Sequence, residues 1–288
     1  MKMLSDLFVW LTVATVLLLL LEIVSGRHKG VYQKGDFPLL IGSFLVGRWL
    51  MVPLGTAIKG GLFALLFTQY QGALSGTPFW IAFPAVLLVN EFCFYWVHRW
   101  AHQGINTNIP LLPVLWKIHR THHSGKHMNV SLLFRLNVTW FLIIPAGWVC
   151  GFALFLGLGE AVLVVLLVTQ AWNLITHSHF RWDNAVRQHR WAGPLFRALE
   201  HVFVSPGIHH THHGYGRDGK HYRNYGTVLS LYDWMFGTLH IPEGRPFRYG
   251  LPGDNAHWLE ELFYPLVNMS GKDKVSSAAA AVEPERSQ

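Results

Sequence analysis

Residues 79–102 read FWIAFPAVLLVNEFCFYWVHRWAH, an apolar run that ends in two histidines four residues apart. Residues at this spacing lie on the same face of an α-helix, so both imidazoles can point to one side. An apolar run of this length can cross most of a bilayer as a helix. We therefore expect a membrane-spanning helix with a pair of metal ligands at its end, because neutral imidazole is the most common nitrogen ligand for transition metals.

The spacing of this histidine pair recurs twice further along the chain. The segments His119-Arg-Thr-His122-His123 and His209-His-Thr-His212-His213 each place histidines three and four residues apart. One such pair arises by chance on many helix surfaces, but three motifs together are strong evidence for a common role. Eight imidazoles exceed what one octahedral ion can bind. The pattern therefore predicts a site for two metal ions with the ligands His98, His102, His119, His122, His123, His209, His212 and His213.

One further histidine joins these motifs by its helical phase. Asn173 and His177 lie four residues apart on one face of the expected helix, so His177 is predicted as a ninth ligand. His179 faces away if that helix continues, which favours an interfacial position, and His210 has the wrong phase within its motif. The remaining histidines lack the spacing and are expected to be surface or packing residues: His28, His127, His189, His201, His221, His240 and His257.

The composition indicates where this site lies. Hydrophobic residues make up 51% of the 288 residues, charged residues only 14%, and the mean hydropathy is +0.26. A soluble domain usually carries about 25% charged residues. Residues 7–24 form the first long apolar stretch. Because no small-residue cleavage site follows it, we expect a retained membrane anchor and not a signal peptide.

Two further apolar stretches are less uniform than residues 79–97. The stretch at residues 37–70 contains Arg48 and Lys59, which we interpret as one full span with a partial or interfacial helix. The stretch at residues 138–172 is interrupted by Gly157-Leu-Gly159-Glu160, which predicts a hairpin of two spans. Together the stretches predict an all-α integral-membrane helical bundle of about four to six membrane helices.

Basic residues beside the histidine motifs indicate the side of the membrane on which they lie. Lysines and arginines crowd the segment after residue 97 and the segment after the hairpin, and such segments usually stay in the cytoplasm. The hairpin returns the chain to the side it left, so all three motifs are expected in one cytosolic helical cap. The net charge of +7 is then a signal of topology and of contact with anionic lipid. Since no basic recognition fold is visible, we expect no nucleic-acid partner.

Three features outside the motifs add to this picture. Glu91 lies almost two turns before His98 and faces the same side, so we expect it to accept the N–H of a ligating imidazole. A glutamate at the interface that simply reaches water is the alternative. Cys93 and Cys150 fall in separate apolar stretches and offer neither a disulfide framework nor a thiolate metal cluster. Residues 269–288 are polar and alanine-rich and are expected to form a disordered tail.

The motifs resemble those of the fatty acid hydroxylase / sterol desaturase superfamily of integral-membrane non-haem di-iron enzymes. The resemblance covers roughly residues 91–252 and rests on Glu91-Phe-Cys-Phe-Tyr-Trp-Val-His98, the two HxxHH motifs, Asn224-Tyr-Gly226 and Tyr232-Asp-Trp-Met-Phe-Gly-Thr238. Acyl-CoA desaturases also carry three histidine motifs but are not expected to share the two downstream segments. Many members of the superfamily have arginine and an apolar residue where this chain has His210 and Thr211, so we expect the local contacts there to differ.

The resemblance also implies an organisation and a function. Residues 1–90 would be N-terminal membrane helices, and residues 91–268 a catalytic domain that includes the transmembrane hairpin at 138–176. Two iron ions, which zinc can replace in purified protein, would activate O₂ for hydroxylation or desaturation of a lipid C–H bond. A separate ferredoxin, cytochrome b5 or reductase would supply the electrons. Three residues would support the ligands without binding metal: Glu91, Asn173 and Asp233.

Two other classes of protein stay open on the sequence alone. A zinc-dependent membrane hydrolase could use some of these histidines, although it needs a carboxylate as general base and the HxxHH motifs contain none. A non-catalytic metal-binding membrane protein, such as a transporter or a sensor, could also carry many histidines. It would be expected to place them along a pore within its spans and not at helix ends.

Overall fold

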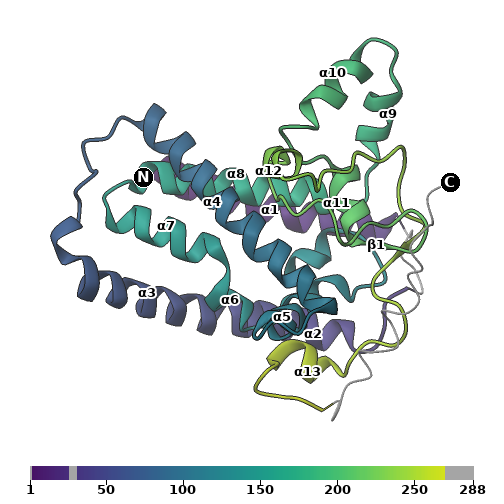
Figure 1. Cartoon of the computed structure of the whole chain (residues 1–288), viewed down its shortest axis with the longest axis horizontal. Helices are drawn as coiled ribbons and strands as arrows, with labels where there is room; N and C mark the ends of the chain where they lie inside the picture. The colour runs from purple at the N-terminus through teal and green to yellow at the C-terminus, as the bar shows by residue number, and fades with distance from the viewer. Residues whose placement is uncertain (1, 26–30, 270–288) are drawn as a thin grey trace.

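A computed structural model of the chain describes residues 2–25 and 31–269, and these residues are mostly helical with almost no sheet (Figure 1). The long helices extend to the left of Figure 1, and short helices gather on its right with a two-stranded ribbon. His28 and the predicted tail, apart from Met269, lie outside the described residues. The fold is the predicted all-α bundle, with a cap of short helices at one end.

Three helical segments in the described part of the chain are long and apolar enough to cross a membrane: Asp36–Tyr70, Phe79–Asn106 and Gly159–His177. Two shorter apolar helices accompany them, Val9–Val24 within α1 (Lys2–Val24) and α7 (Pro145–Phe155). Only 17% of the most apolar window of the first segment, and 28% of those of the other two, is buried inside the molecule. The outward-facing apolar side chains are those expected of helices that contact lipid tails, so the chain is a membrane protein.

The first long segment corrects one prediction. Residues 36–70 form one continuous helical segment, so the separate partial helix expected there is wrong; it consists of α2 (Asp36–Gly42), the π-helical η1 (Ser43–Met51), α3 (Val52–Phe67) and the 3-10 turn η2 (Thr68–Tyr70). Lys59 does not interrupt it because its ammonium group finds partners inside the bundle. The Lys59 Nζ lies 3.4 Å from the carbonyl oxygen of Phe141 and 5.3 Å from the centre of the Trp148 ring.

The predicted hairpin is present, but its two arms differ. Helix α8 (Gly159–His177) is a full-length arm, whereas the other arm is broken into α6 (Trp140–Ile143) and α7 at Pro145, which cannot continue a hydrogen-bonded helix. Eleven residues give α7 a length of only about 16 Å. Gly157 adopts φ +96° in the turn, a left-handed conformation that favours glycine.

Small side chains let the membrane helices approach one another closely. The buried cluster between α4 (Phe79–Gln103), α7 and α8 contains three alanines and three valines with one cysteine: Ala82, Val86, Cys150, Ala153, Ala161, Val162 and Val165. Without a hydrophobic driving force in lipid, such close packing is a main source of helix association. It fixes the relative positions of α4 and α8, whose other ends enter the cap.

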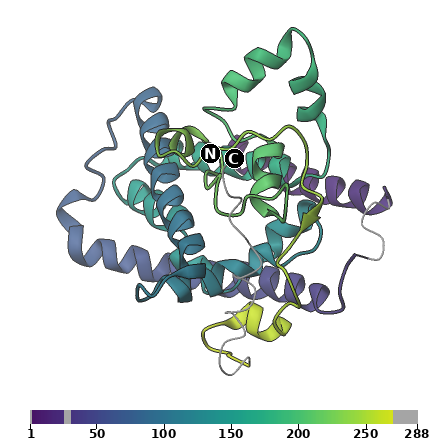
Figure 2. The ribbon, with the colours of Figure 1, turned by 45° about the vertical axis from the view of Figure 1, so that its right-hand side comes forward.

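The cap follows the ends of α4 and α8. Its elements are η3 (Gly104–Asn106), α5 (Leu112–His123), η4 (Val130–Phe134), α9 (Trp182–Gln188), α10 (Ala192–Leu199), α11 (Pro206–His213), β1 (Gly214–Tyr215), α12 (Leu231–Met235), β2 (Arg248–Tyr249) and α13 (Trp258–Phe263). Strands β1 and β2 pair antiparallel. Figures 1 and 2 both show α9 and α10 projecting from the bundle, whereas α5 contacts α4 and α11 contacts α8. Together with the contact between α4 and α8, these two contacts bring all three histidine motifs together.

Candidate metal centre

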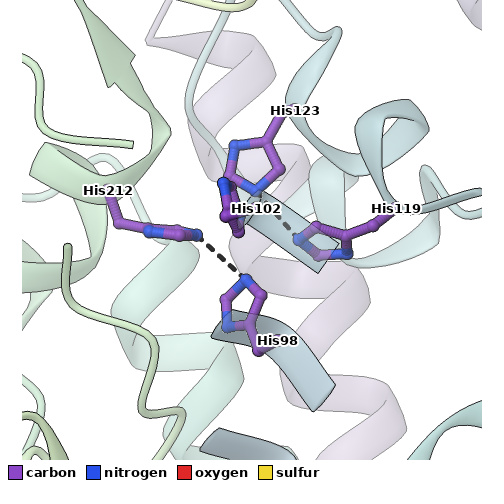
Figure 3. Close-up of side chains that lie close together, drawn as sticks. All are labelled: His98, His102, His119, His123 and His212. Carbon is purple, nitrogen blue, oxygen red and sulfur yellow. Dashed lines mark hydrogen bonds between the residues drawn. The ribbon is translucent and has the colours of Figure 1, made fainter. Parts of the chain in front are cut away.

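The nine histidines predicted as ligands lie in two adjacent groups at the ends of α4, α5, α8 and α11. Within each group the ligand nitrogens all lie within 4.8 Å of one another. Figure 3 shows the first group, with the five imidazoles turned toward a common centre. The five-histidine group is His98, His102, His119, His123 and His212, and the four-histidine group is His122, His177, His209 and His213.

Helix geometry explains how each motif divides between the two groups. Residues four apart on a helix point the same way, and the pairs His98–His102, His119–His123 and His209–His213 each stay within one group. Adjacent residues point about 100° apart. Consequently His122 and His123 belong to different groups, and so do His212 and His213. A histidine doublet at a helix end therefore serves two groups at once.

Main-chain carbonyl groups fix the orientation of three of these imidazoles. The Nδ1 of His98 lies 2.7 Å from the Tyr225 carbonyl oxygen, and the Nδ1 of His212 lies 2.7 Å from the Arg223 carbonyl oxygen. The Nδ1 of His177 lies 2.9 Å from the carbonyl oxygen of Asn173 on the preceding turn. A carbonyl oxygen only accepts, so each Nδ1 carries the proton and donates it. Each Nε2 is then left with a lone pair directed into its group.

The spacing between the Nε2 atoms fits bound metal ions. The Nε2 atoms of His98 and His212 lie 3.0 Å apart although neither carries a proton, which calls for a cation between them. In the other group, the Nε2 of His177 lies 3.0 Å from that of His209 and 3.3 Å from that of His122. Two nitrogens bound at a right angle to one ion, with metal–nitrogen bonds of about 2.1 Å, lie roughly 3.0 Å apart.

Unpaired nitrogens and low proton affinity agree with this fit. Both ring nitrogens of His102 and the Nε2 of His213 are buried without a hydrogen-bond partner among the described residues. Burial, reinforced by the neighbouring imidazoles, holds the pKa values of His119, His123, His209 and His213 well below their usual range. These imidazoles are neutral at pH 7, which is the form that binds metal.

The structure corrects the role predicted for Glu91. Among the described residues its carboxylate has no imidazole partner, and it is only 1% exposed; it accepts hydrogen bonds from the backbone N–H groups of Val228 (2.8 Å) and Leu229 (3.0 Å) and from the Thr227 hydroxyl (3.0 Å). The sequence placed Glu91 on the correct face of α4 but could not show that a distant loop covers that face. Glu91 therefore holds the loop that follows Tyr225, whose carbonyl group orients His98.

The other two predicted supporting residues act through the main chain or through a turn. Asn173 orients His177 with its backbone carbonyl group and not with its side chain. The Asp233 carboxylate accepts from the backbone N–H groups of Tyr225 (2.8 Å) and Gly226 (2.7 Å), which shapes the turn that faces His98. Burial raises the pKa of Asp233, while these hydrogen bonds and one from Thr238 oppose the shift. Whether the three residues contribute to metal binding stays a prediction.

Two histidines that are not predicted as ligands are buried next to the two ligand groups. His210 points away from both groups: its Nε2 donates to the Ser178 carbonyl oxygen (3.0 Å), and its Nδ1 lies 3.2 Å from the Tyr249 hydroxyl. The His179 side chain is buried, with 8% of it exposed, and does not face away as it would on a continued helix. The chain turns out of helix at Ser178, and that turn carries the His179 side chain inward instead of outward.

The sequence did not reveal the supporting role of residues 223–225 or the presence of a buried network of ion pairs. The available signal for the first was Asn224-Tyr-Gly226, where Asn224 adopts φ +61°, a left-handed conformation that asparagine tolerates. In the network, Asp183 of α9 pairs with Arg245 and Arg187 and accepts the N–H of Gly207 at the start of α11 (2.8 Å). The network therefore fixes the helix that carries the third motif.

Comparison with known proteins places these features in one family. A model of the fatty acid hydroxylase family matches residues 83–238, more than half of the chain. The chain is 31% identical to an alkylglycerol monooxygenase from Danio rerio over 204 residues, 67% of this chain and 38% of that protein. It is 27% identical to an ornithine lipid hydroxylase from Rhizobium tropici over 243 residues, 77% of this chain and 64% of that protein.

The name of a third relative refers to a different kind of oxidation. The chain is 24% identical to a delta(7)-sterol 5(6)-desaturase from Gibberella zeae over 223 residues, 72% of this chain and 53% of that protein. The chain spans less than two thirds of the length of each of these relatives. No solved structure is a significant match.

Proposed function

The chain belongs to the fatty acid hydroxylase family, and from this premise we propose that it is a membrane-bound di-iron oxygenase that hydroxylates or desaturates a C–H bond of a lipid. The observation that carries the proposal is the pair of imidazole groups where α4 and α8 enter the cap, with the unprotonated Nε2 atoms of His98 and His212 facing each other at 3.0 Å. The nine histidines act as metal ligands, divided five and four between two iron ions.

The iron ions and the chain's own residues have separate tasks. Iron, which unlike zinc is redox-active, supplies the activation of O₂ needed to attack an unactivated C–H bond. The carbonyl groups at Asn173, Arg223 and Tyr225 fix the tautomer and direction of their imidazoles. Burial of the ligands keeps bulk water away from the reacting atoms: His98, His123 and His212 are at most 4% exposed.

The composition of the two groups argues against the alternative classes. In the described part of the chain neither group contains a carboxylate, and Glu91 is fully engaged by backbone N–H groups, so a zinc hydrolase would have no general base at the metals. The histidines also gather at helix ends and not along a span, which does not suit a pore for metal transport.

The substrate class follows from the relatives and from the membrane. The names of the three relatives refer to an alkylglycerol, an ornithine lipid and a sterol, so we assign a lipid substrate that reaches the site from the bilayer. Electrons come from a separate protein, either a ferredoxin, a cytochrome b5 or a reductase. We propose that the site, and the docking of that donor, lie on the cytoplasmic side of a multi-pass protein, which the basic segments around the motifs support.

Oxygen labelling tests the proposed reaction directly. Cells that express the chain are grown under ¹⁸O₂, and their lipids are compared with those of cells that express the His123→Ala variant. A hydroxylase gives a lipid that carries ¹⁸O only with the wild-type chain, and a desaturase gives a lipid two hydrogens lighter without the label. Identical lipid profiles, with both proteins present in the membrane, would contradict the proposal.

Cysteine labelling tests the proposed side of the membrane. In a background without Cys93 and Cys150, single cysteines at Lys126 and Lys220 are expected to react only with reagent that reaches the cytoplasm. A cysteine at Gly157, in the turn of the hairpin, should react from the opposite side. If positions 126 and 220 react from opposite faces, the shared site and its cytoplasmic location are both wrong.

A further inference from the structure

Helix α1 carries a buried carboxylate in an otherwise apolar stretch. Glu22 lies near the C-terminal end of this helix and is 0% exposed. A carboxylate at such a position is expensive to bury unless its oxygens are engaged. The sequence predicts only a membrane anchor here, and α1 lies outside the region that matches the family model. Glu22 therefore calls for an explanation that anchoring does not give.

Both carboxylate oxygens of Glu22 accept hydrogen bonds from backbone N–H groups of the cap. Oε1 lies 2.7 Å from the nitrogen of His179, and Oε2 lies 2.9 Å from the nitrogen of Val130. The Nδ1 of His179 is a further 3.8 Å neighbour of Oε1. One side chain of α1 thus joins two cap segments that are far apart in the sequence.

These two segments come shortly after helices that carry members of the four-histidine group. His179 comes two residues after His177, the last residue of α8, and Val130 begins η4 in the segment that follows α5. The same turn is held from the other side, because the carbonyl oxygen of Ser178 accepts from the Nε2 of His210 on α11. Residues 178–179 are therefore clamped between α1 and α11, immediately beyond His177.

We propose that Glu22 is a positioning residue for the four-histidine group: its carboxylate fixes the turn after α8, and with it His177 relative to His122 and His209. Helix α1 is then a part of the metal centre and not only an anchor. The inference rests on the proposed function insofar as that group binds a metal ion. Without the carboxylate, two buried backbone N–H groups lose their acceptor and the turn relaxes, while the five-histidine group keeps all of its own supports.

Metal titration of two variants tests this role without relying on activity. Purified, metal-free protein in detergent is titrated with Co²⁺ under anaerobic conditions. In Glu22→Gln the second ion, which is the one in the four-histidine group, should bind about 10–100-fold more weakly, the usual effect of losing a partner that orients ligands. The first ion, in the five-histidine group, should bind as in the wild type. The matched control is Thr15→Val on the same helix, since the buried Thr15 hydroxyl donates to the carbonyl oxygen of Leu11 within α1 and contacts no histidine ligand among the described residues; it should bind both ions normally.

The outcomes separate this inference from the proposed function. Wild-type protein that binds no metal would contradict the proposed function, and the role of Glu22 with it. Wild-type protein that binds two ions, together with a Glu22→Gln variant that binds two ions equally well, would overturn only the role of Glu22. If Glu22→Gln does not fold, Glu22→Asp keeps the charge but shortens the reach; a smaller, selective weakening of the second ion is expected, and equal weakening of both ions or of neither overturns the inference.

Discussion

The two ends of the helical bundle are held together by different interactions. Far from the cap, α4, α7 and α8 meet through small apolar side chains such as Val86, Ala153 and Val165. At the cap, α4 and α8 carry His98 and His177, imidazoles that are oriented by carbonyl oxygens from elsewhere in the chain or from their own helix. The same two helices thus begin in an apolar contact and end in a polar network.

This difference indicates which substitutions should affect stability and which should affect metal binding. Apolar packing needs only side chains of suitable volume, so it tolerates change with modest losses of stability. A buried polar network needs a partner for every donor and acceptor, so one lost group leaves others unsatisfied. We therefore expect changes at the apolar end to alter stability alone, and changes at the cap end to alter metal binding and activity. The predictions below test that separation.

Removal of a ligand should have the largest effect. His123→Ala and His209→Ala each take one imidazole from a different group, and each should abolish lipid oxidation and lower the bound metal, because the nitrogens that remain lose part of a shared ion. Lipid analysis together with metal content measures both effects. His189, which is exposed and lies outside both groups, is the control; loss of activity or metal in His189→Ala, comparable with the other two variants, would contradict the assignment.

The second largest effect is expected from the ion network that holds the start of α11. Asp183→Asn leaves the buried Arg245 without its counter-charge, and breaking a buried pair usually costs about 3–5 kcal/mol. Although burial raises the pKa of Asp183, hydrogen bonds and charge from Arg245 and Arg187 hold it below its ordinary value of 3.8. The lowered pKa means that the stabilisation is fully present above that value and is lost as the pH falls through the folded-state pKa.

Thermal unfolding in detergent as a function of pH checks this. The difference in stability between wild type and Asp183→Asn should stay constant between about pH 5 and 8 and shrink only in stronger acid, below roughly pH 4. A difference that disappears near neutral pH would show that the carboxylate does not act as an ionised partner of Arg245.

A smaller effect is expected from Glu91. Glu91→Gln keeps one acceptor oxygen for the N–H groups of Val228 and Leu229, and it should weaken metal binding or turnover by about tenfold, at the low end of the range for groups that orient ligands. Thr227→Val removes only the hydroxyl contact and should have less effect. Metal titration compares the two. A larger loss in Thr227→Val than in Glu91→Gln would show that the carboxylate does not hold this loop.

The apolar end should give the smallest effect. Val165 of α8 is fully buried in the apolar cluster with α4 and α7, and Val165→Ala should lower stability by about 1 kcal/mol through a small cavity. Metal content and turnover should remain at wild-type values. A change in the metal-to-protein ratio of this variant would show that the two ends are coupled and that the separation proposed here is wrong.

The sequence predicted the parts of this molecule that follow from local periodicity. Apolar runs gave the bundle and the hairpin at Gly157, and the spacing of histidines selected the nine side chains that converge in two groups. It did not predict the continuous helix at residues 36–70, because the partners of Lys59 come from α6 and α7. A charge in an apolar run indicates a break only when no partner lies nearby.

Contacts between segments that are distant in the sequence account for the features that the sequence did not predict. The periodicity of α4 placed Glu91 on the face of His98, but the loop at residues 227–229 that covers this face comes from far along the chain. Likewise nothing in the local sequence around Glu22 indicates that its carboxylate meets backbone groups at Val130 and His179. Side chains that support a site through tertiary contacts have no fixed spacing, so periodicity cannot find them.

The metal content of the purified protein tests the central claim most directly. After anaerobic reconstitution with Fe²⁺ and removal of excess metal, mass spectrometry of the wild-type chain should give about two iron ions per chain, one for each histidine group. Replacing His102 in one group and His209 in the other, singly, should each reduce this ratio, and the double variant should bind almost none. A wild-type ratio of one or less, or a ratio that the double variant leaves unchanged, would contradict the two-ion centre.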